Sequence, residues 1–160
     1  MQMDSRPESH SAFIDILKLE IEQAQRLLDL LQQEYQLLRS PPSEALTKLQ
    51  SEKKARLEDV EKSTILHRQF LLQRGLSADR AGTDAFVEGD EEQQGYWNAY
   101  LILLEKCQKQ NEINGGAVEL NQRHVNQALG ILLGMGDSQK TYGPSGESRP
   151  TNPSKSLGKA

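Results

Sequence analysis

Apolar residues in the first quarter of the chain recur at alternating steps of three and four positions. The series comprises Ile14, Leu17, Ile21, Ala24, Leu28, Leu31, Tyr35 and Leu38. This spacing places the side chains along one stripe of a helix and is typical of coiled-coil packing. Further apolar residues widen the stripe, which favours contact with two neighbouring helices: Phe13, Ile16, Leu19, Leu27, Leu30 and Leu37. We therefore expect a helix over about residues 10–39, which ends before Pro41 and Pro42.

A second helix is predicted over about residues 44–74. Ser43 is suited to cap its first turn, Glu44 complements the positive end of the helix dipole, and Gly75 is suited to end it. Its apolar stripe is thinner and contains Leu46, Leu49, Leu57, Val60, Leu66, Phe70 and Leu71. The middle of the segment carries the cations Lys53, Lys54 and Arg56. These cations form either a solvated face or a contact with an acidic partner.

Residues 75–95 are expected to form an irregular turn region with a short helix over about 78–87, capped by Ser77. Four acids follow within five positions: Glu88, Asp90, Glu91 and Glu92. Acidic residues stabilise the positive end of a helix, so this group is expected to start the next helix. A binding patch is the alternative interpretation of the same charges.

A third long helix is predicted over about residues 91–134. One heptad series contains Trp97, Leu104, Asn111, Val118, Val125 and Leu132, and its companion contains Tyr100, Cys107, Asn114, Asn121 and Ala128. Both series keep their phase across Gly115 and Gly116, although a glycine inside a helix costs about 1 kcal/mol. The preserved phase favours one continuous or kinked helix, and a break at the two glycines is the alternative.

Three asparagines occupy stripe positions in this segment: Asn111, Asn114 and Asn121. Polar residues at core-facing positions lower stability and often fix the register of helices. They also indicate a stretch that neighbouring helices cover only in part. The apolar block that follows, over residues 118–133, extends past the expected reach of the first two helices. It is therefore a candidate for contact with a partner helix.

The composition changes at residue 137. Residues 137–160 are rich in Ser, Thr, Gly, Pro and Lys, and their apolar members are Tyr142, Leu157 and Ala160. Such a segment buries too little surface to offset the cost of ordering its backbone, about 1–2 kcal/mol per residue. We therefore predict a disordered tail over 137–160, in which Tyr142 either anchors a partner or folds back onto the helices. Residues 1–136 form the predicted domain, which is all-α, with long antiparallel helices in a coiled-coil-like bundle.

Composition narrows the possible functions. A formal charge of −4 over 160 residues does not fit the basic footprint of a nucleic-acid binder. The longest apolar run, Ala99 to Leu104, is far shorter than the ~20 residues of a membrane span, and the N-terminus shows no apolar signal segment. The single cysteine, Cys107, excludes an internal disulfide. We expect Cys107 to be a small buried hydrophobe, and a reactive thiol is the alternative. Together these features predict a soluble cytoplasmic protein without membrane insertion.

The sequence predicts no catalytic, cofactor-binding or metal-binding residues. The three histidines, His10, His67 and His124, are too far apart to form a metal-binding pair on a helix. Nucleotide-binding and metalloprotease motifs are missing, and the many acids are those expected of solvated helix faces. We therefore do not expect an enzyme.

Three elements follow one another in the last third of the chain: Asn111-Glu-Ile-Asn114-Gly115, then Arg123-His-Val-Asn-Gln127-Ala128-Leu129, then, after a polar link, Tyr142-Gly-Pro-Ser-Gly146. Their order and spacing match the Asn-x-x-Asn-Gly, Arg-x-x-x-Gln-Ala-Leu and Tyr-Gly-x-x-Gly pattern of the FlgN family of flagellar export chaperones. The chain resembles this family over essentially its whole length, and the specific part of the resemblance runs from Asn111 to Gly146. Glu52-Lys53 and Arg68 with Leu71-Leu72 are also similar to the second helix of the family, whereas Gly116 replaces a residue that is often larger and apolar in relatives.

The resemblance implies a chaperone of the flagellar type III export system. It implies binding to the C-terminal helical segments of the hook–filament junction proteins FlgK and FlgL, and delivery to the export gate protein FlhA. The client-binding residues implied on this chain are Asn111, Asn114, Val118, Val125, Leu129, Leu132 and Leu133. Tyr142 and Gly143 are the implied gate-docking residues. The alternative is a structural or adaptor coiled-coil protein that acts by homo-oligomerisation through its first helix, and a homodimer is compatible with either interpretation.

Overall fold

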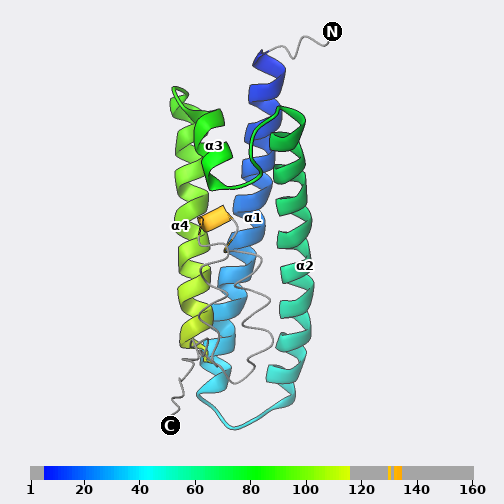
Figure 1. The fold of residues 1–160 in the computed structure, drawn as a ribbon. Coiled ribbons are helices and arrows are strands. Elements are labelled where there is room, and N and C mark those ends of the chain that lie inside the picture. Colours follow the sequence, from blue (N-terminus) through cyan, green and yellow to red (C-terminus); the bar gives the residue numbers. More distant parts are fainter. Residues whose placement is uncertain (1–5, 116–129, 131, 135–160) are drawn as a thin grey trace, which may run out of the picture.

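The computed structural model describes residues 6–115, 130 and 132–134, and in these residues the secondary structure is helical. Three long helices and one short helix make up the bundle: α1 (Arg6–Leu38), α2 (Glu44–Gln73), α3 (Arg80–Val87) and α4 (Glu91–Ile113) (Figure 1). The all-α bundle predicted from the sequence is confirmed. The predicted domain from residue 1 to residue 136 extends beyond the described residues at both ends, and the predicted disordered tail over 137–160 lies outside them.

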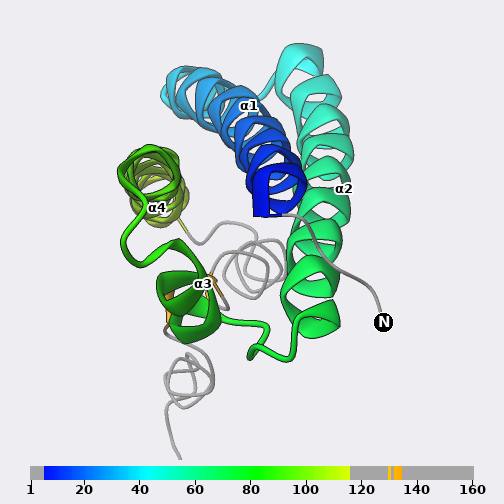
Figure 2. The same ribbon diagram turned by 90° about the horizontal axis from the view of Figure 1, so that it is seen from above.

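Helix α1 is the central element of the bundle. It packs against both α2 and α4, while α3 contacts α4 and α2 near one end (Figure 2). Figure 1 shows that α2 runs antiparallel to α1 and that α4 runs antiparallel to α2, so α1 and α4 are parallel. A helix with two long neighbours needs a wide apolar face, which explains why the stripe of α1 extends beyond a two-stranded heptad pattern.

Residues of the types expected at helix termini cap α2 and α4. Ser43 caps α2 by accepting a hydrogen bond from the Leu46 backbone N–H at 3.3 Å, and Gly75, with φ of 74°, follows its last turn. Asp90 caps α4 by accepting from the Gln93 backbone N–H at 2.9 Å, which confirms that the acidic group starts this helix. The predicted cap of α3 is wrong. Asp79, not Ser77, accepts from the Gly82 backbone N–H, because the Ser77 hydroxyl donates to the Asp79 carboxylate instead.

The single helix expected over 91–134 is also wrong, and the alternative of a break is confirmed. Helix α4 ends at Ile113, Asn114 caps it, and Gly115 has a φ of 87°. A left-handed residue cannot continue a right-handed helix, and glycine adopts this conformation without a steric penalty. The heptad phase that the sequence keeps across Gly115 therefore does not require an unbroken helix. Of the stripe residues that follow Gly115, Leu132 lies within the described residues and is buried.

The apolar core extends along α1 and is richest in aromatic residues near α3. Phe13, Phe70 and Phe86 come from α1, α2 and α3, and their ring centroids lie 4.8 to 5.1 Å apart. One position of the predicted α2 stripe is wrong, because Leu66 is about half exposed and His67 occupies the core position beside it. In the described part of the chain, no helix combines the length and the apolar character that a membrane crossing requires.

Candidate functional site

A buried ion pair joins the three long helices near the C-terminal end of α4. Lys53 of α2 donates from Nζ to Glu34 Oε1 of α1 at 3.0 Å and to Asn111 Oδ1 of α4 at 3.0 Å. The Lys53 and Glu34 side chains are 6% and 5% exposed. Both interpretations of Lys53 from the sequence, as part of a solvated face or of an acidic-partner contact, are therefore wrong. The spacing of Lys53 in the sequence could have predicted its burial, because it lies four residues from both Leu49 and Leu57 on one core-facing stripe of α2.

Asn114 completes this polar layer. Its amide Nδ2 donates to the Leu31 carbonyl and to Glu34 Oε1, each at 2.8 Å, and its Oδ1 accepts from Gln110 Nε2 at 2.9 Å. Asn111 and Asn114 are buried, so the expectation that neighbouring helices cover this stretch only in part is wrong for these two residues. The hydrogen bonds hold the last turn of α4 in register with α1 and α2.

A second buried polar cluster lies nearer to α3. His67 Nδ1 is 2.5 Å from Glu20 Oε1, and His67 Nε2 is 2.8 Å from the Thr83 hydroxyl, which donates to the Asp79 carbonyl. Burial raises the pKa of Glu20, and the contact with His67 opposes that rise. Burial also raises the pKa of nearby Tyr100 well above its ordinary value.

This second cluster combines a carboxylate, an imidazole and a hydroxyl, which are groups used in nucleophilic catalysis. Glu20, His67 and Thr83 have no solvent exposure, so a substrate cannot reach them. The cluster instead links α1, α2 and α3. The cluster was not predicted from the sequence, although His67 lies seven residues after Val60 and Glu20 three residues after Leu17, which is the spacing of core-facing positions on a helix.

The remaining reactive side chains of the described residues have ordinary structural environments. Cys107 is buried, its thiol donates to the Ala24 carbonyl, and burial raises its pKa to about 12. A thiol that stays protonated at neutral pH is a poor nucleophile, which supports the predicted buried hydrophobe. His10 pairs with Asp90 at 3.0 Å, and within the described ranges no three His, Cys, Asp or Glu side chains gather as a metal site. His124 lies outside those ranges.

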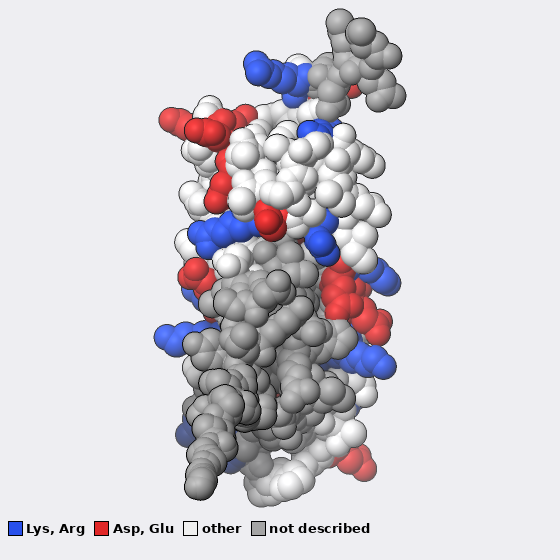
Figure 3. Space-filling model, in the orientation of Figure 1, with Lys and Arg blue, Asp and Glu red and all other residues white. Residues whose placement is uncertain are grey.

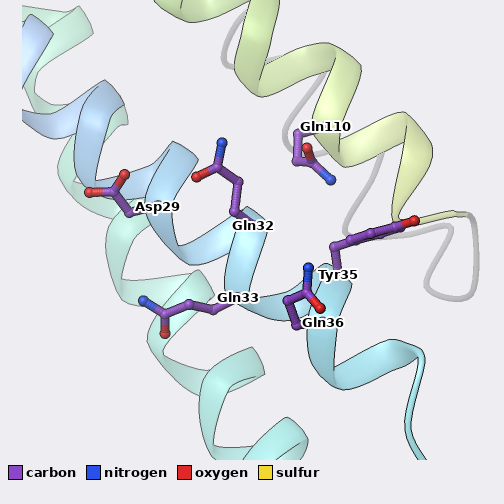
Figure 4. A pocket seen from close by; sticks show the side chains of 6 residues that line it. All are labelled: Asp29, Gln32, Gln33, Tyr35, Gln36 and Gln110. Atoms are coloured by element: carbon purple, nitrogen blue, oxygen red, sulfur yellow. The ribbon is translucent and has the colours of Figure 1, made fainter.

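An open hollow of about 570 Å³ lies on the outer side of α1 and α4 (Figure 4). Its lining is mostly amide: Asp29, Gln32, Gln33, Tyr35, Gln36 and Gln110. Amide side chains offer hydrogen-bond donors and acceptors but little acid–base or nucleophilic chemistry. Figure 3 shows basic and acidic side chains interspersed over the described part of another face, without a basic stripe of the kind that tracks a phosphate backbone.

Two of the predicted client-binding residues, Leu132 and Leu133, are buried in the same apolar core as the long helices. The Leu133 carbonyl accepts a hydrogen bond from Arg80 Nη1 of α3 at 3.1 Å. The expectation of an uncovered apolar helix end is therefore wrong for this pair. The other predicted residues of the block and of the gate-docking element lie outside the described residues: Val118, Asn121, Val125, Leu129, Tyr142 and Gly143.

Comparison with known proteins agrees with the resemblance in the motifs. A family model described as FlgN protein matches residues 3–150. The structure is similar to the crystal structure of a flagella synthesis protein, FlgN, from Pseudomonas aeruginosa, with a TM-score of 0.66 and 26% sequence identity. That match covers 81% of this chain and 98% of the other. A comparison with curated proteins gives no match. Because the family model spans nearly the whole sequence, the chain belongs to the FlgN family of non-enzymatic flagellar export chaperones.

Proposed function

We propose that this chain binds the C-terminal helical segments of the hook–filament junction proteins FlgK and FlgL in the cytoplasm and delivers them to the export gate protein FlhA. The observation that carries the proposal is the family match over residues 3–150, which includes the helical bundle and both proposed contact segments. Membership of the family itself implies binding to hook-associated proteins.

The amphipathic block over residues 118–133 is the proposed client-binding segment, and Val118, Val125 and Leu129 are its proposed apolar contacts. Leu132 and Leu133 belong to the same block but are buried in the core, so they would contact a client only after release from it. An amphipathic helix binds by laying its apolar side into a complementary apolar surface, so this chemistry suits a helical client. Asn111 and Asn114 contribute in another way, because both are buried. They hold the end of α4, and so set where the following residues begin.

The client must be released at the export gate, so moderate affinity suits this role. We expect a dissociation constant on the order of micromolar, equivalent to ~8 kcal/mol. Tyr142 and Gly143 form the proposed gate-docking element, which is separated from the client-binding block along the chain. Separate segments allow the gate to bind while the client is still held.

Titration with C-terminal peptides of FlgK and FlgL from the same organism tests the proposal. Saturable binding to at least one peptide is expected, and a chain that lacks residues 118–160 should keep the α1–α4 bundle but lose that binding. Circular dichroism checks the bundle, and a scrambled peptide of the same composition is the control. If neither FlgK nor FlgL peptide binds saturably, the chaperone proposal is wrong for these clients.

The alternative of a structural or adaptor coiled-coil protein needs an apolar stripe on α1 that is free to associate. In the described bundle the stripe residues Leu17, Ala24, Leu28 and Leu31 are buried. They are therefore used within the chain. Analytical ultracentrifugation of the truncated and full-length chains separates the two functions, since an adaptor would keep its oligomer after the truncation.

A further inference from the structure

One hydrogen bond from α3 holds the end of the proposed client-binding segment. Arg80 is the first residue of α3, and its Nη1 donates to the Leu133 carbonyl at 3.1 Å. Leu132 has no exposed surface and Leu133 is 6% exposed. Figure 1 shows this segment, in orange, beside α3 and α4. The two leucines thus lie in the core, and the charged Arg80 side chain donates to the backbone carbonyl of the second one.

A close backbone approach accompanies this hydrogen bond. Gly134 has a φ of 81°, and a Cβ at this position would lie 3.3 Å from Arg80 Cδ. The alkyl part of Arg80 therefore packs against the turn at Gly134 while its guanidinium reaches Leu133. Glycine is suited to both requirements because it tolerates positive φ and has no side chain to displace Arg80.

The position of Arg80 is itself fixed by the buried cluster below α3. Thr83, one turn further along α3, contacts His67 of α2, and His67 contacts Glu20 of α1. The Asp79 side chain caps the same helix. These contacts anchor the backbone of α3, and so they place the base of the Arg80 side chain within reach of the Leu133 carbonyl.

Leu132 and Leu133 cannot contact a client while they are in the core. We propose that Arg80 is a positioning residue that holds these two leucines in the bundle, so that the free chain inhibits its own binding to an amphipathic helical client. This inference rests on the proposed function. As a consequence, the apparent client affinity equals the affinity of the released form multiplied by the fraction of molecules in which the leucines are released.

Two substitutions weaken the contact from opposite sides. Arg80→Ala removes the donor, and the side chain is 43% exposed, so little of the core changes. Gly134→Ala leaves the donor in place but forces a Cβ into a positive-φ position against Arg80. Arg68→Ala is the matched control, because Arg68 also donates to a backbone carbonyl, and that carbonyl belongs to Ala78 rather than to Leu133.

Two measurements on the full chain test the inference. Hydrogen–deuterium exchange of a proteolytic fragment over residues 130–136 should be about fivefold faster in Arg80→Ala and Gly134→Ala than in the unmodified chain, as expected for the loss of one hydrogen bond. The affinity for a fluorescent C-terminal peptide of FlgK or FlgL should rise about fivefold in both variants. Arg68→Ala should change neither quantity.

The outcomes separate the inference from the proposed function. Unchanged exchange in both variants overturns the role of Arg80. Faster exchange with unchanged or weaker peptide binding also overturns self-inhibition, because it shows that release of the leucines does not favour the client. If neither the unmodified chain nor any variant binds either peptide, the proposed function fails for these clients. The exchange rates still report, in that case, whether Arg80 holds residues 132–134.

Discussion

Lys53 Nζ of α2 lies 3.0 Å from Glu34 Oε1 of α1, and both side chains are buried. The same carboxylate oxygen accepts from Asn114 of α4 at 2.8 Å, so one charged group connects three helices. Removing one member of a buried ion pair leaves the other charge without compensation, and this cost exceeds the net contribution of the intact pair. We therefore expect the layer to fix the register of the three helices more than it adds net stability.

The first prediction concerns this pair. Lys53→Met should lower the free energy of unfolding by about 3–5 kcal/mol, because Glu34 would remain buried and charged. The double substitution Lys53→Met with Glu34→Leu should cost less than Lys53→Met alone. Urea denaturation followed by circular dichroism measures both. A loss below about 1 kcal/mol for Lys53→Met would show that water reaches Glu34, contrary to its burial.

The second prediction concerns the pH dependence of stability. Burial raises the pKa of Glu20 in the folded chain above its ordinary value of 4.5. The stabilisation from the protonated carboxyl is therefore complete below pH 4.5 and is lost as the pH rises through the folded pKa. Glu20→Gln cannot lose a proton, so its stability relative to the unmodified chain should increase as the pH rises from 4.5 toward neutrality.

Denaturant unfolding at a series of pH values measures this difference. Glu22→Gln is the control, because Glu22 is 55% exposed and pairs with Arg26 on the surface. The Glu22 variant should keep a nearly constant difference from the unmodified chain. A constant difference for Glu20→Gln as well would mean that His67 compensates the burial of Glu20 completely.

The third prediction compares two glycines. A Cβ at Gly82 would lie 1.7 Å from the Ser77 carbonyl oxygen, which is backbone and cannot move without shifting the α2–α3 connection. Gly82→Ala should therefore destabilise the chain by at least about 2 kcal/mol. Gly95, inside α4, has nothing within 4 Å of the added carbon, so Gly95→Ala should stabilise by about 0.5–1 kcal/mol. Thermal unfolding of both variants gives the comparison, and equal shifts would refute the close approach at Gly82.

The fourth prediction concerns the proposed division between client binding and gate docking. Tyr142→Ala should leave the affinity for the FlgK or FlgL peptide within about twofold, because the substituted residue lies outside the 118–133 block. Binding to the cytoplasmic domain of FlhA should fall. Pull-down with that domain and peptide titration measure the two activities separately. Loss of peptide binding with normal FlhA binding would show that the two roles are assigned to the wrong segments.

The break after α4 shows where a pattern in the sequence has two structural solutions. The heptad phase across Gly115 favoured one long helix, but a regular spacing of apolar residues is also compatible with a helix that ends between them. Gly115 adopts a φ of 87°, and the Asn114 side chain bonds to the Leu31 carbonyl and Glu34 of α1. Those bonds join residues about 80 positions apart, so local spacing could not predict them.

The all-α class, the helix boundaries near Ser43, Gly75 and Asp90, and the family could be predicted from the amino-acid sequence, because capping chemistry, helical periodicity and linear motifs are local properties. The burial of Lys53 and His67, and the place of Leu132 and Leu133 in the core, became evident only in the folded chain. A charged or polar residue at a stripe position is compatible with solvent or with the interior. The outcome depends on whether partners from distant helices, such as Glu34 and Glu20, arrive at the same level and offset the cost of desolvation.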